Sequence, residues 1–533
     1  MLRITELKLP LNHSADDLQS AVLNRLQIHL NEFVSSRIFR QGHDARKRNG
    51  ILLVYTLDVD VKNEAEILAR FADDAHISVT PNTEYSLITR AITPPKNRPI
   101  IIGSGPCGLL ATLILAQMGF KPIMLERGKS VRERTKDTFA LWRKSQFNAE
   151  SNVQFGEGGA GTFSDGKLYT QIKDPNFYGR KVLQEFVKAG APPEILYLSK
   201  PHIGTFRLVT MLEKIRATIE SLGGEIRFES RVDEVLIEKG HVQGVQLSNG
   251  ETLESSHVIL AIGHSARDTF SMLQRNGVYM EAKPFSMGFR IEHPQSLIDQ
   301  CSFGNDAGHP LLGAADYKLV HHCKNGRSVY SFCMCPGGTV VAATSEAGHV
   351  VTNGMSQYSR NERNANSAIV VGITPEIDYP EHILAGVDLQ RHWERQAFLL
   401  GGENYAAPAQ LVGDFLAKRP STTFGSVQPS YTPSVKLGDL SAALPDYAVA
   451  AIREALPEFD KKIKGFAMHD ALLTAVETRT SSPIRIKRTA QFQSLNTVGL
   501  YPAGEGAGYA GGILSAAIDG IKVAEAVAKS LQA

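Results

Sequence analysis

The chain has 533 residues, which is too long for a single hydrophobic core, and this length predicts about three domains. Hydrophobic residues make up 43% of it and charged residues 21%, as in globular proteins, while a formal net charge of +2 argues against a surface that mainly coats nucleic acid. The N-terminus has no signal-peptide pattern, and five cysteines suit a reducing compartment, so we expect a cytoplasmic protein. The most apolar helix candidate, Leu109–Met118, is too short to cross a bilayer, so we expect no membrane span.

Residues 1–92 form a separate block with its own alternation of polar and apolar residues. We expect a small α+β module, built from strands at Leu2–Leu9 and Gly50–Val61 and helices at Ser14–Asn31 and Glu64–Phe71. The basic run at residues 46–48 is typical of a solvated turn, and a linker follows at 93–99. We assign this module no chemistry.

A strand-turn-helix-strand pattern begins at Pro99. The apolar run Pro99–Ile102 predicts a buried strand, GSGPCG at 103–108 is a GxGxxG motif, and a helix over Leu109–Met118 leads to a second strand, Lys121–Leu125. This order is typical of a dinucleotide-binding βαβ unit.

Each residue type in this motif has a physical role. Gly103 allows the tight turn, Gly105 lets the backbone approach a pyrophosphate, and Gly108 permits close packing of helix on strand. The pyrophosphate would accept hydrogen bonds from the first N–H groups of the helix. Glu126, at the end of the second strand, is placed to accept hydrogen bonds from ribose hydroxyls.

A second glycine-dense segment lies at Val153–Leu168. Four glycines fall within residues 156–161, too many for the interior of a helix or strand. We expect this loop to expose backbone N–H groups and fold over the same ligand; a flexible surface loop is the alternative.

The rest of this first part, 93–270, alternates helix and strand. Helices are predicted at 131–148 and 208–221, and strands at 225–228, 232–237, 242–247 and 258–261. The last strand runs into AIGHSARD, 261–268, whose small residues would let the backbone pass the ligand.

Residues 271–470 have no second GxGxxG after a strand, which argues against a separate NAD(P) domain. Strand-like pieces occur at Phe285–Ile291, Val329–Met334 and Thr339–Ala343. The polar run Asn353–Val371 predicts either a pocket lining or a structured loop. We interpret this segment as a substrate or cap domain inserted into the nucleotide-binding fold.

A third glycine cluster lies in the final segment, 471–533. A strand at Thr497–Tyr501, a glycine turn over 504–512 and an amphipathic helix at Ile513–Leu531 repeat the strand-glycine-helix pattern. Gly504 lies 504 − 103 = 401 positions after Gly103, so a shared ligand would explain two such units.

Six segments together resemble the two-dinucleotide-binding-domain flavoproteins, the glutathione-reductase-like superfamily, and within it a family of bacterial FAD-dependent dehydrogenases. They are GSGPCG with Glu126, GEGGAGTFSDGKL, AIGHSARD, CMCPGGTVV, ETRTSSPIRI and YPAGEGAGYAGGILSAAIDG. The resemblance covers most of the chain after residue 97. It implies an α/β fold, in which a Rossmann-like FAD-binding domain carries an inserted α+β domain.

The resemblance also implies a noncovalent FAD site. Gly504 and Glu505 would hold the ribityl side, with Glu in place of the more usual Asp, Val232 would lie near the adenine, and the last helix dipole would stabilise charge on the reduced flavin. The predicted cofactor-binding residues are Gly103, Ser104, Gly105, Pro106, Gly108, Glu126, Arg127, Gly158, Gly159, Ala160, Gly161, Val232, Ala261, Gly263, Gly504, Glu505, Gly511, Gly512 and Ile513.

Cys333 and Cys335 are candidates for redox chemistry. On a regular strand both would face one side with Met334 opposite, as small core residues do, and a CxC disulfide would be strained, so packing is favoured over a redox pair. Cys107, in the phosphate turn, could be acidified by the helix N-terminus, although packing is the expected role.

Three polar residues are candidates for the site. Arg479 and Arg485 could stabilise reduced flavin or clamp an acidic substrate, or could pair with Glu477. His264 could act as a base, although a lone histidine is more often structural.

We expect no metal site, because a short run, His321 to Cys323, holds the only clustered ligands.

These features predict an FAD-dependent oxidoreductase that transfers hydride between a small-molecule substrate and the flavin, with NAD(P)H at most a transient reductant. They identify no catalytic residue. Two alternatives remain: an FAD-dependent RNA-modifying protein whose basic N-terminal module grips nucleic acid, and a flavin-binding module without turnover.

Overall fold

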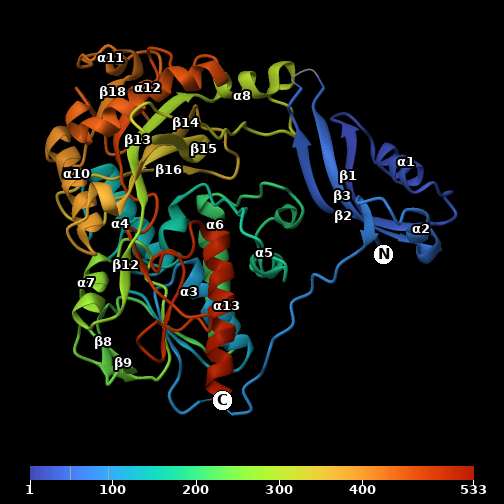
Figure 1. The fold of residues 1–533 in the computed structure, drawn as a ribbon, viewed down its shortest axis with the longest axis horizontal. Helices are drawn as coiled ribbons and strands as arrows, with labels where there is room; N and C mark the ends of the chain where they lie inside the picture. The colour runs from blue at the N-terminus through green and yellow to red at the C-terminus, as the bar shows by residue number, and fades with distance from the viewer. Residues whose placement is uncertain (48–49, 94, 533) are drawn as a thin grey trace.

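The computed structural model describes residues 1–47, 50–93 and 95–532. Arg48 of the predicted basic run and Pro94 of the predicted linker lie outside the described residues. Three bodies are visible: the N-terminal module at the right, a lower body that ends in α13, and an upper body around a large sheet (Figure 1). Within the described ranges, none of the helices combines the length and apolar character that crossing a membrane requires.

The N-terminal module is a four-stranded sheet in the order β2-β3-β1-β4, with α1 and α2. Its elements are β1 (Leu2–Pro10), α1 (Ala15–Leu26), β2 (Phe33–Asp44), β3 (Leu52–Val61), α2 (Glu64–Arg70) and β4 (Ile77–Val79). Ser14 caps α1 in a capping box with Asp17, as the sequence pattern indicated. Strand β2 was not predicted, because its largely exposed, polar residues show no buried face.

The lower body is built on a five-stranded sheet in the order β22-β11-β5-β6-β7, with every pairing parallel. These strands are β5 (Ile100–Ile102), β6 (Ile123–Leu125), β7 (Glu225–Arg227), β11 (Val258–Leu260) and β22 (Leu500–Pro502). Its helices are α3 (Pro106–Gln117), α4 (Val131–Lys144), α5 (Tyr178–Lys188), α6 (Thr205–Ser221), α7 (Arg267–Arg275) and α13 (Ile513–Gln532). A small antiparallel sheet adds β8 (Val232–Glu238), β9 (His241–Leu247) and β10 (Thr252–Glu254). The predicted parallel strands and the predicted last helix are confirmed.

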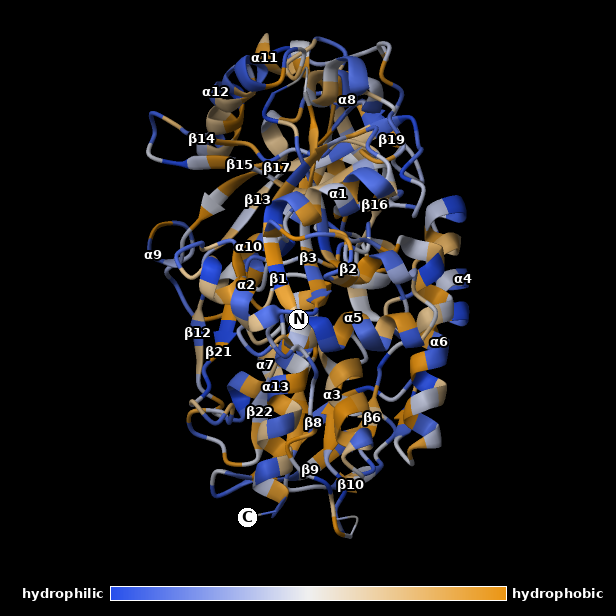
Figure 2. Ribbon diagram, turned by 90° about the vertical axis from the view of Figure 1, so that its right-hand side faces the viewer, coloured by the Kyte–Doolittle hydropathy of each residue, from blue (hydrophilic) through white to orange (hydrophobic). Residues whose placement is uncertain are grey.

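Helices α3 and α13 pack directly on each other in the centre of this body (Figures 1 and 2). Helix α3 is buried along almost its whole length, so it is apolar on all sides rather than amphipathic. Gly520 of α13 allows the close approach, because a Cβ there would lie 2.2 Å from the carbonyl oxygen of Cys107. Two segments of the lower body that lie far apart in the sequence are thereby held together.

The upper body is a mostly antiparallel sheet in the order β14-β15-β17-β13-β20-β18-β19, with β16 paired to β15. Its strands are β13 (Phe285–Pro294), β14 (Val320–His322), β15 (Ser328–Ala342), β16 (Thr352–Ser356), β17 (Asn364–Ile373), β18 (Ala407–Leu411), β19 (Val435–Leu437) and β20 (Leu472–Glu477). The helices are α8 (Gln295–Phe303), α9 (Pro375–Asp378), α10 (Ala385–Gly401), α11 (Val412–Leu416) and α12 (Asp446–Lys462). A ribbon of β12 (Met280–Ala282) and β21 (Ile484–Ile486) leads from this sheet to the parallel one.

Two predictions for this body are wrong in detail. The strands predicted at 329–334 and 339–343 form one strand, β15, because the CPGG segment between them continues the pairing with irregular register. The loop interpretation of 353–371 is wrong, because most of this run lies in β16 and β17, and β17 is buried almost throughout. A buried antiparallel strand with Asn and Ser on it does not show the apolar run that reveals most buried strands.

The division of the chain at residues 92, 270 and 470 stays a prediction. Strand β20 pairs with β13 and β18 of the large sheet, whereas β22 belongs to the parallel sheet. The mixed α/β character of the fold is confirmed.

Candidate functional site

A cavity of about 250 Å³ lies between the parallel sheet and the large sheet. On one side it is lined by the turns after β5 and β11, the second glycine segment and the start of α13. On the other side it is lined by β15, β16 and the segment after β20. The site therefore forms where the carboxyl ends of parallel strands meet a second domain, a common location for ligand binding in α/β folds.

The first glycine motif lines this cavity with residues 103–107. Gly103 has φ +100° and sits against the backbone of Ala261, where a Cβ would lie 2.4 Å from the carbonyl oxygen. Gly105 is the N-cap of α3, with no side chain capping the helix, and Pro106 occupies its first turn. The first turn of α3 thus presents backbone N–H groups without a competing side chain, which favours an anionic ligand.

The second glycine segment folds directly onto the first. The N–H of Gly158 donates to the carbonyl of Ser104 at 2.9 Å. Gly159 approaches Gly105 so closely that a Cβ added to Gly159 would lie 2.9 Å from the Cα of Gly105. The segment then turns into a short 3₁₀ helix over Gly159–Phe163. Because the segment is largely buried against the first motif, the surface-loop alternative is wrong, and the expectation that the segment folds over a shared ligand stays a prediction.

The third glycine cluster reaches the same cavity. Glu505, Gly511, Gly512 and Ile513 line it. Glu505 Oε1 lies 3.2 Å from Nδ1 of His264, so this histidine, read from the sequence as a residue without a partner, has one.

Glu126 is engaged by the protein itself. Its Oε2 accepts hydrogen bonds from the N–H of Ser104 at 2.9 Å and from its hydroxyl at 2.7 Å, and Oε1 accepts from the N–H groups of Gly128 and Gly156. These four bonds match the acceptor capacity of a carboxylate. Glu126 therefore ties the first and second glycine segments together, and a ribose hydroxyl would have to share one of its oxygens.

Most of the predicted cofactor residues line the cavity, and three do not. Gly108 packs under the turn, where a Cβ would lie 1.9 Å from the carbonyl oxygen of Gly103. Gly158 abuts the side chains of Thr162 and Leu212, and Gly504 abuts Cys107. The lining set is Gly103, Ser104, Gly105, Pro106, Glu126, Arg127, Gly159, Ala160, Gly161, Val232, Ala261, Gly263, Glu505, Gly511, Gly512 and Ile513.

The CxC segment of β15 does not alternate as predicted. The pairing register shifts between Phe332 and Cys335, and Cys333 adopts a left-handed conformation with φ +44°. Cys333 is exposed, whereas Met334 and Cys335 are buried, and both cysteines line the cavity. All five cysteines are free thiols. The interpretation of Cys333 as a core residue is therefore wrong, because a bulge reorients it.

Cys107 is a packing residue, as expected, and the alternative of an acidified thiol is wrong. Burial raises the pKa of its thiol well above the ordinary value, and the charge of Asp519 acts in the same direction. Desolvation of the thiolate outweighs the helix N-terminus at this position.

Arg479 does not form the ion pair with Glu477 that was one of the alternatives from the sequence. Glu477 binds Arg290, at 3.1 Å, and not Arg479. Arg479 binds the buried Glu394 and also donates to the hydroxyls of Ser265 and Ser345.

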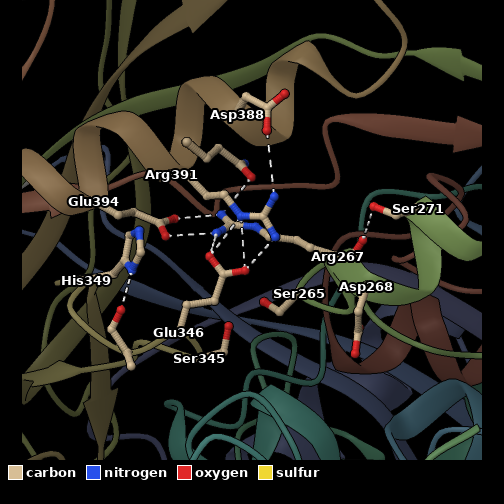
Figure 3. A network of polar contacts seen from close by, with 12 residues as sticks. Ser265, Arg267, Asp268, Ser271, Ser345, Glu346, His349, Asp388, Arg391 and Glu394 are labelled. Carbon is tan, nitrogen blue, oxygen red and sulfur yellow. Dashed lines mark hydrogen bonds and ion pairs between the residues drawn. The ribbon is translucent and has the colours of Figure 1, made fainter. Parts of the chain in front are cut away.

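A buried charge network lies beside the cavity, between α7 and α10 (Figure 3). Arg267 reaches Glu394 at 2.8 Å and Glu346 at 2.8 Å, and Arg391 pairs with Glu346. Glu394 is fully buried and accepts hydrogen bonds from both Arg267 and Arg479. The network connects the two bodies at the edge of the cavity.

Acidification should weaken this network, and the unfolding free energy should fall with it. Burial alone would raise the pKa of Glu346, but the hydrogen bond from Arg391 and the charges of Arg267 and Arg391 outweigh burial and lower the pKa to about 2. Because the folded pKa lies below the unfolded value of about 4.3, the stabilisation is complete above the unfolded pKa and is lost as the pH falls through the folded one.

We therefore compare denaturant midpoints at pH 5 and pH 3, a range that covers roughly the upper part of the interval between the two pKa values. Between these pH values the midpoint of Glu346→Gln should fall less than the midpoint of wild type does. Glu254→Gln, at an exposed strand position, should follow wild type. Parallel pH profiles for Glu346→Gln and wild type would contradict the assignment.

Sequence reasoning missed several residues at the cavity. Asp165 and Lys167 sit in the second glycine segment, where charged residues next to glycines could have indicated them. Asn353 begins the polar run that was predicted either to line a pocket or to form a loop, and it lines the cavity from β16. Glu477 lines the cavity from the end of β20, while Glu394 of α10 and Glu346 of the loop between β15 and β16 lie beside it. No local pattern marks these three glutamates as site residues, because only the tertiary structure brings them to the site.

Residues 284–480 match the family model described as "FAD-dependent protein, C-terminal domain-like", and residues 1–60 match a domain of unknown function. A phytoene desaturase (neurosporene-forming) of Cereibacter sphaeroides is 29% identical over 107 residues, which cover 19% of this chain and 20% of the desaturase. The crystal structure of L-proline dehydrogenase from P. horikoshii aligns with 82% of this chain and 95% of its own at 13% identity, with a TM-score of 0.32.

An uncharacterized protein of Clostridium beijerinckii is 48% identical to this chain over 525 residues, which cover 98% of each. The chain therefore belongs to the same protein family as this Clostridium beijerinckii protein.

Proposed function

We propose that the protein is an oxidoreductase that binds FAD noncovalently in the cavity and passes hydride between the flavin and a small-molecule substrate. The observation that carries the proposal is one cavity lined on one side by three glycine segments and on the other by the FAD-dependent C-terminal domain. FAD, when bound, would supply the hydride acceptor, and the protein would supply orientation and electrostatics.

The residues at the cavity fit a dinucleotide. A Cβ added at Gly263, Gly511 or Gly512 would meet no atom within 4 Å, so these glycines keep space open for a ligand. Nε2 of His264 is buried without a hydrogen-bond partner among the described residues, and this ring lines the same cavity. Open space flanked by bare backbone and an unpaired polar atom is what a bound polar ligand would fill.

We assign the pyrophosphate to the turn of Gly103, Ser104 and Gly105 at the first turn of α3. The adenosine would extend toward Glu126 and Val232, and the isoalloxazine toward Gly511, Gly512 and Ile513. The assignment is supported by the lining of the cavity, which includes Glu126, Val232 and Gly511 to Ile513.

The charge of Lys167, which lines the cavity, favours an anionic substrate. Burial lowers the pKa of Lys167, but the nearby Cys335, Cys333 and Asp165 outweigh burial and raise it, so its ammonium group stays charged. Lys167 donates a hydrogen bond to the carbonyl of Met334 and lies 3.9 Å from Asp165. Because Asp165 is also bound by Arg360, and Glu477 by Arg290, the charge of Lys167 is only partly neutralised and would attract a ligand carboxylate.

Two measurements test the proposal. The purified protein should be yellow and release about one FAD per chain on denaturation, and the flavin should bleach anaerobically with at least one member of a panel of NADH, NADPH and carboxylate metabolites. A preparation that neither contains nor takes up FAD would refute the proposal. Bleaching by dithionite alone would favour a flavin-binding module without turnover.

A further inference from the structure

We propose that His321, Cys323 and Glu454 form a binding site for a divalent transition metal, with Zn²⁺ as the best-suited ion. One ligand atom from each of these residues lies within 4.8 Å of the other two. The cluster is on the upper body, and none of its residues lines the FAD cavity. It is therefore separate from the proposed flavin site.

The strand geometry places the first two ligands on one face. His321 is in β14, paired with Val329 of β15, and Cys323 follows two positions later. Residues two apart on an extended chain point to the same side. His322, between them, points away and its Nδ1 lies 2.9 Å from the hydroxyl of Ser328.

Helix α12 supplies the third ligand. Oε1 of Glu454 lies 3.2 Å from Nε2 of His321 and accepts a hydrogen bond from the N–H of Lys324 at 3.0 Å. The turn is fixed to the same helix by Asn325, whose amide donates to the carbonyl of Tyr447. A ligand carboxylate oriented by a backbone N–H is the kind of outer contact that metal sites use.

The donor set and spacing suit zinc. One thiolate, one neutral imidazole and one carboxylate would balance the charge of Zn²⁺, with water as the fourth ligand. Bonds of about 2.0–2.3 Å in a tetrahedral site place ligand atoms roughly 3.3–3.8 Å apart. Nε2 of His321 and Oε1 of Glu454, 3.2 Å apart, lie just below this range, so a small side-chain adjustment would reach the required separation. Sγ of Cys323, now 3.5 Å from the carbonyl oxygen of Ala451, would have to turn toward the pair.

The expectation that the chain has no metal site is thus revised. The sequence shows only the short run from His321 to Cys323, and Glu454 lies 454 − 323 = 131 positions further on. Only the packing of α12 on β14 brings the third ligand into place.

The test uses the full-length flavoprotein, treated with a chelator and then titrated. Zn²⁺ binding is measured by calorimetry, and Co²⁺ binding by its ligand-field bands at wavelengths longer than the flavin absorption. We expect one equivalent of either metal. Cys323→Ser should weaken binding by about 100-fold or more, since even outer-contact mutations cost 10–100-fold, and Glu454→Gln should weaken it by about 10-fold or more.

Matched controls are His322→Gln, which changes the ring that points away, and Cys301→Ser, which removes a thiol outside the cluster. Both should bind metal as wild type does. Unchanged binding in Cys323→Ser, or no Co²⁺ bands in wild type, would overturn the proposal. Flavin content and circular dichroism report folding, and if Cys323→Ser fails to fold, unchanged affinity in Glu454→Gln would overturn it instead.

Discussion

Replacing Gly105 with Asp should yield a folded protein that no longer retains FAD. Gly105 has φ −67° and ψ 178°, which any residue can adopt, and an added Cβ would meet only the Cα of Gly159, at 3.9 Å. Asp is among the best N-cap residues, so the apoprotein should be at least as stable as the parent. Its carboxylate would occupy the helix N–H groups and repel the pyrophosphate.

The expected loss of FAD affinity is about 100-fold or more. Two charge-assisted hydrogen bonds contribute about 1.5–3 kcal/mol each, and every 1.4 kcal/mol or so is tenfold in affinity. The measurement is FAD binding to the apoprotein by flavin fluorescence, with thermal unfolding of each apoprotein as the check on folding.

Two variants separate charge from bulk. Gly105→Asn has nearly the same shape and the same capping ability without the charge, and should bind FAD more tightly than Gly105→Asp. Gly438→Asp adds a carboxylate where a Cβ meets no atom within 4 Å and φ is not in the left-handed region, and should bind as wild type does. Wild-type FAD affinity in Gly105→Asp would show that the pyrophosphate is not held at this turn.

Replacing Glu394 with Ala should produce the largest loss of stability. Glu394 is 0% exposed and forms two contacts each with Arg267 and Arg479, whose side chains are also buried. Burial would raise the pKa of Glu394, but the two arginines outweigh burial and hold it far below its usual range, so the carboxylate is charged at neutral pH. Removing it leaves two guanidinium groups without their main counter-charge.

Breaking a buried ion pair from one side costs about 3–5 kcal/mol, and we expect a loss of this order, measured as the shift of the denaturant midpoint. Glu394→Gln keeps one acceptor oxygen and should fall between wild type and Ala. Glu376→Ala, at an exposed position of α9, should change the midpoint little. A midpoint for Glu394→Ala equal to that of Glu376→Ala would show that the network does not hold the two bodies together.

The lower body, built on the parallel sheet, could be predicted because its signals are local. The strand Ile100–Ile102, the glycine motif and helix α3 are adjacent in sequence, and each requires a particular residue type at a particular position. The same is true of the turn at Gly511 and Gly512 before α13. Glycines needed for close approach therefore identify a site even where the fold around them is not yet known.

The other half of the site could not be predicted in the same way. Cys333 was interpreted from the period of a regular strand, and one register shift in β15 moved it from the core to the cavity. Glu477, two positions away, was one alternative partner for Arg479, but the partner is Glu394 on α10, 85 positions earlier. Burial of charge requires a partner, and the sequence does not say which distant element provides it.

The sequence by itself predicted that three glycine segments lie close together around one ligand, because a tight turn or a close backbone approach selects glycine locally, and the structure brings all three segments to one cavity. The tertiary structure alone decided which side chains face that ligand across the cavity, which arginines are neutralised, and that Glu454 joins His321 and Cys323. These contacts depend on strand register and on helices packed from distant parts of the chain, and neither is encoded in a short stretch of residues.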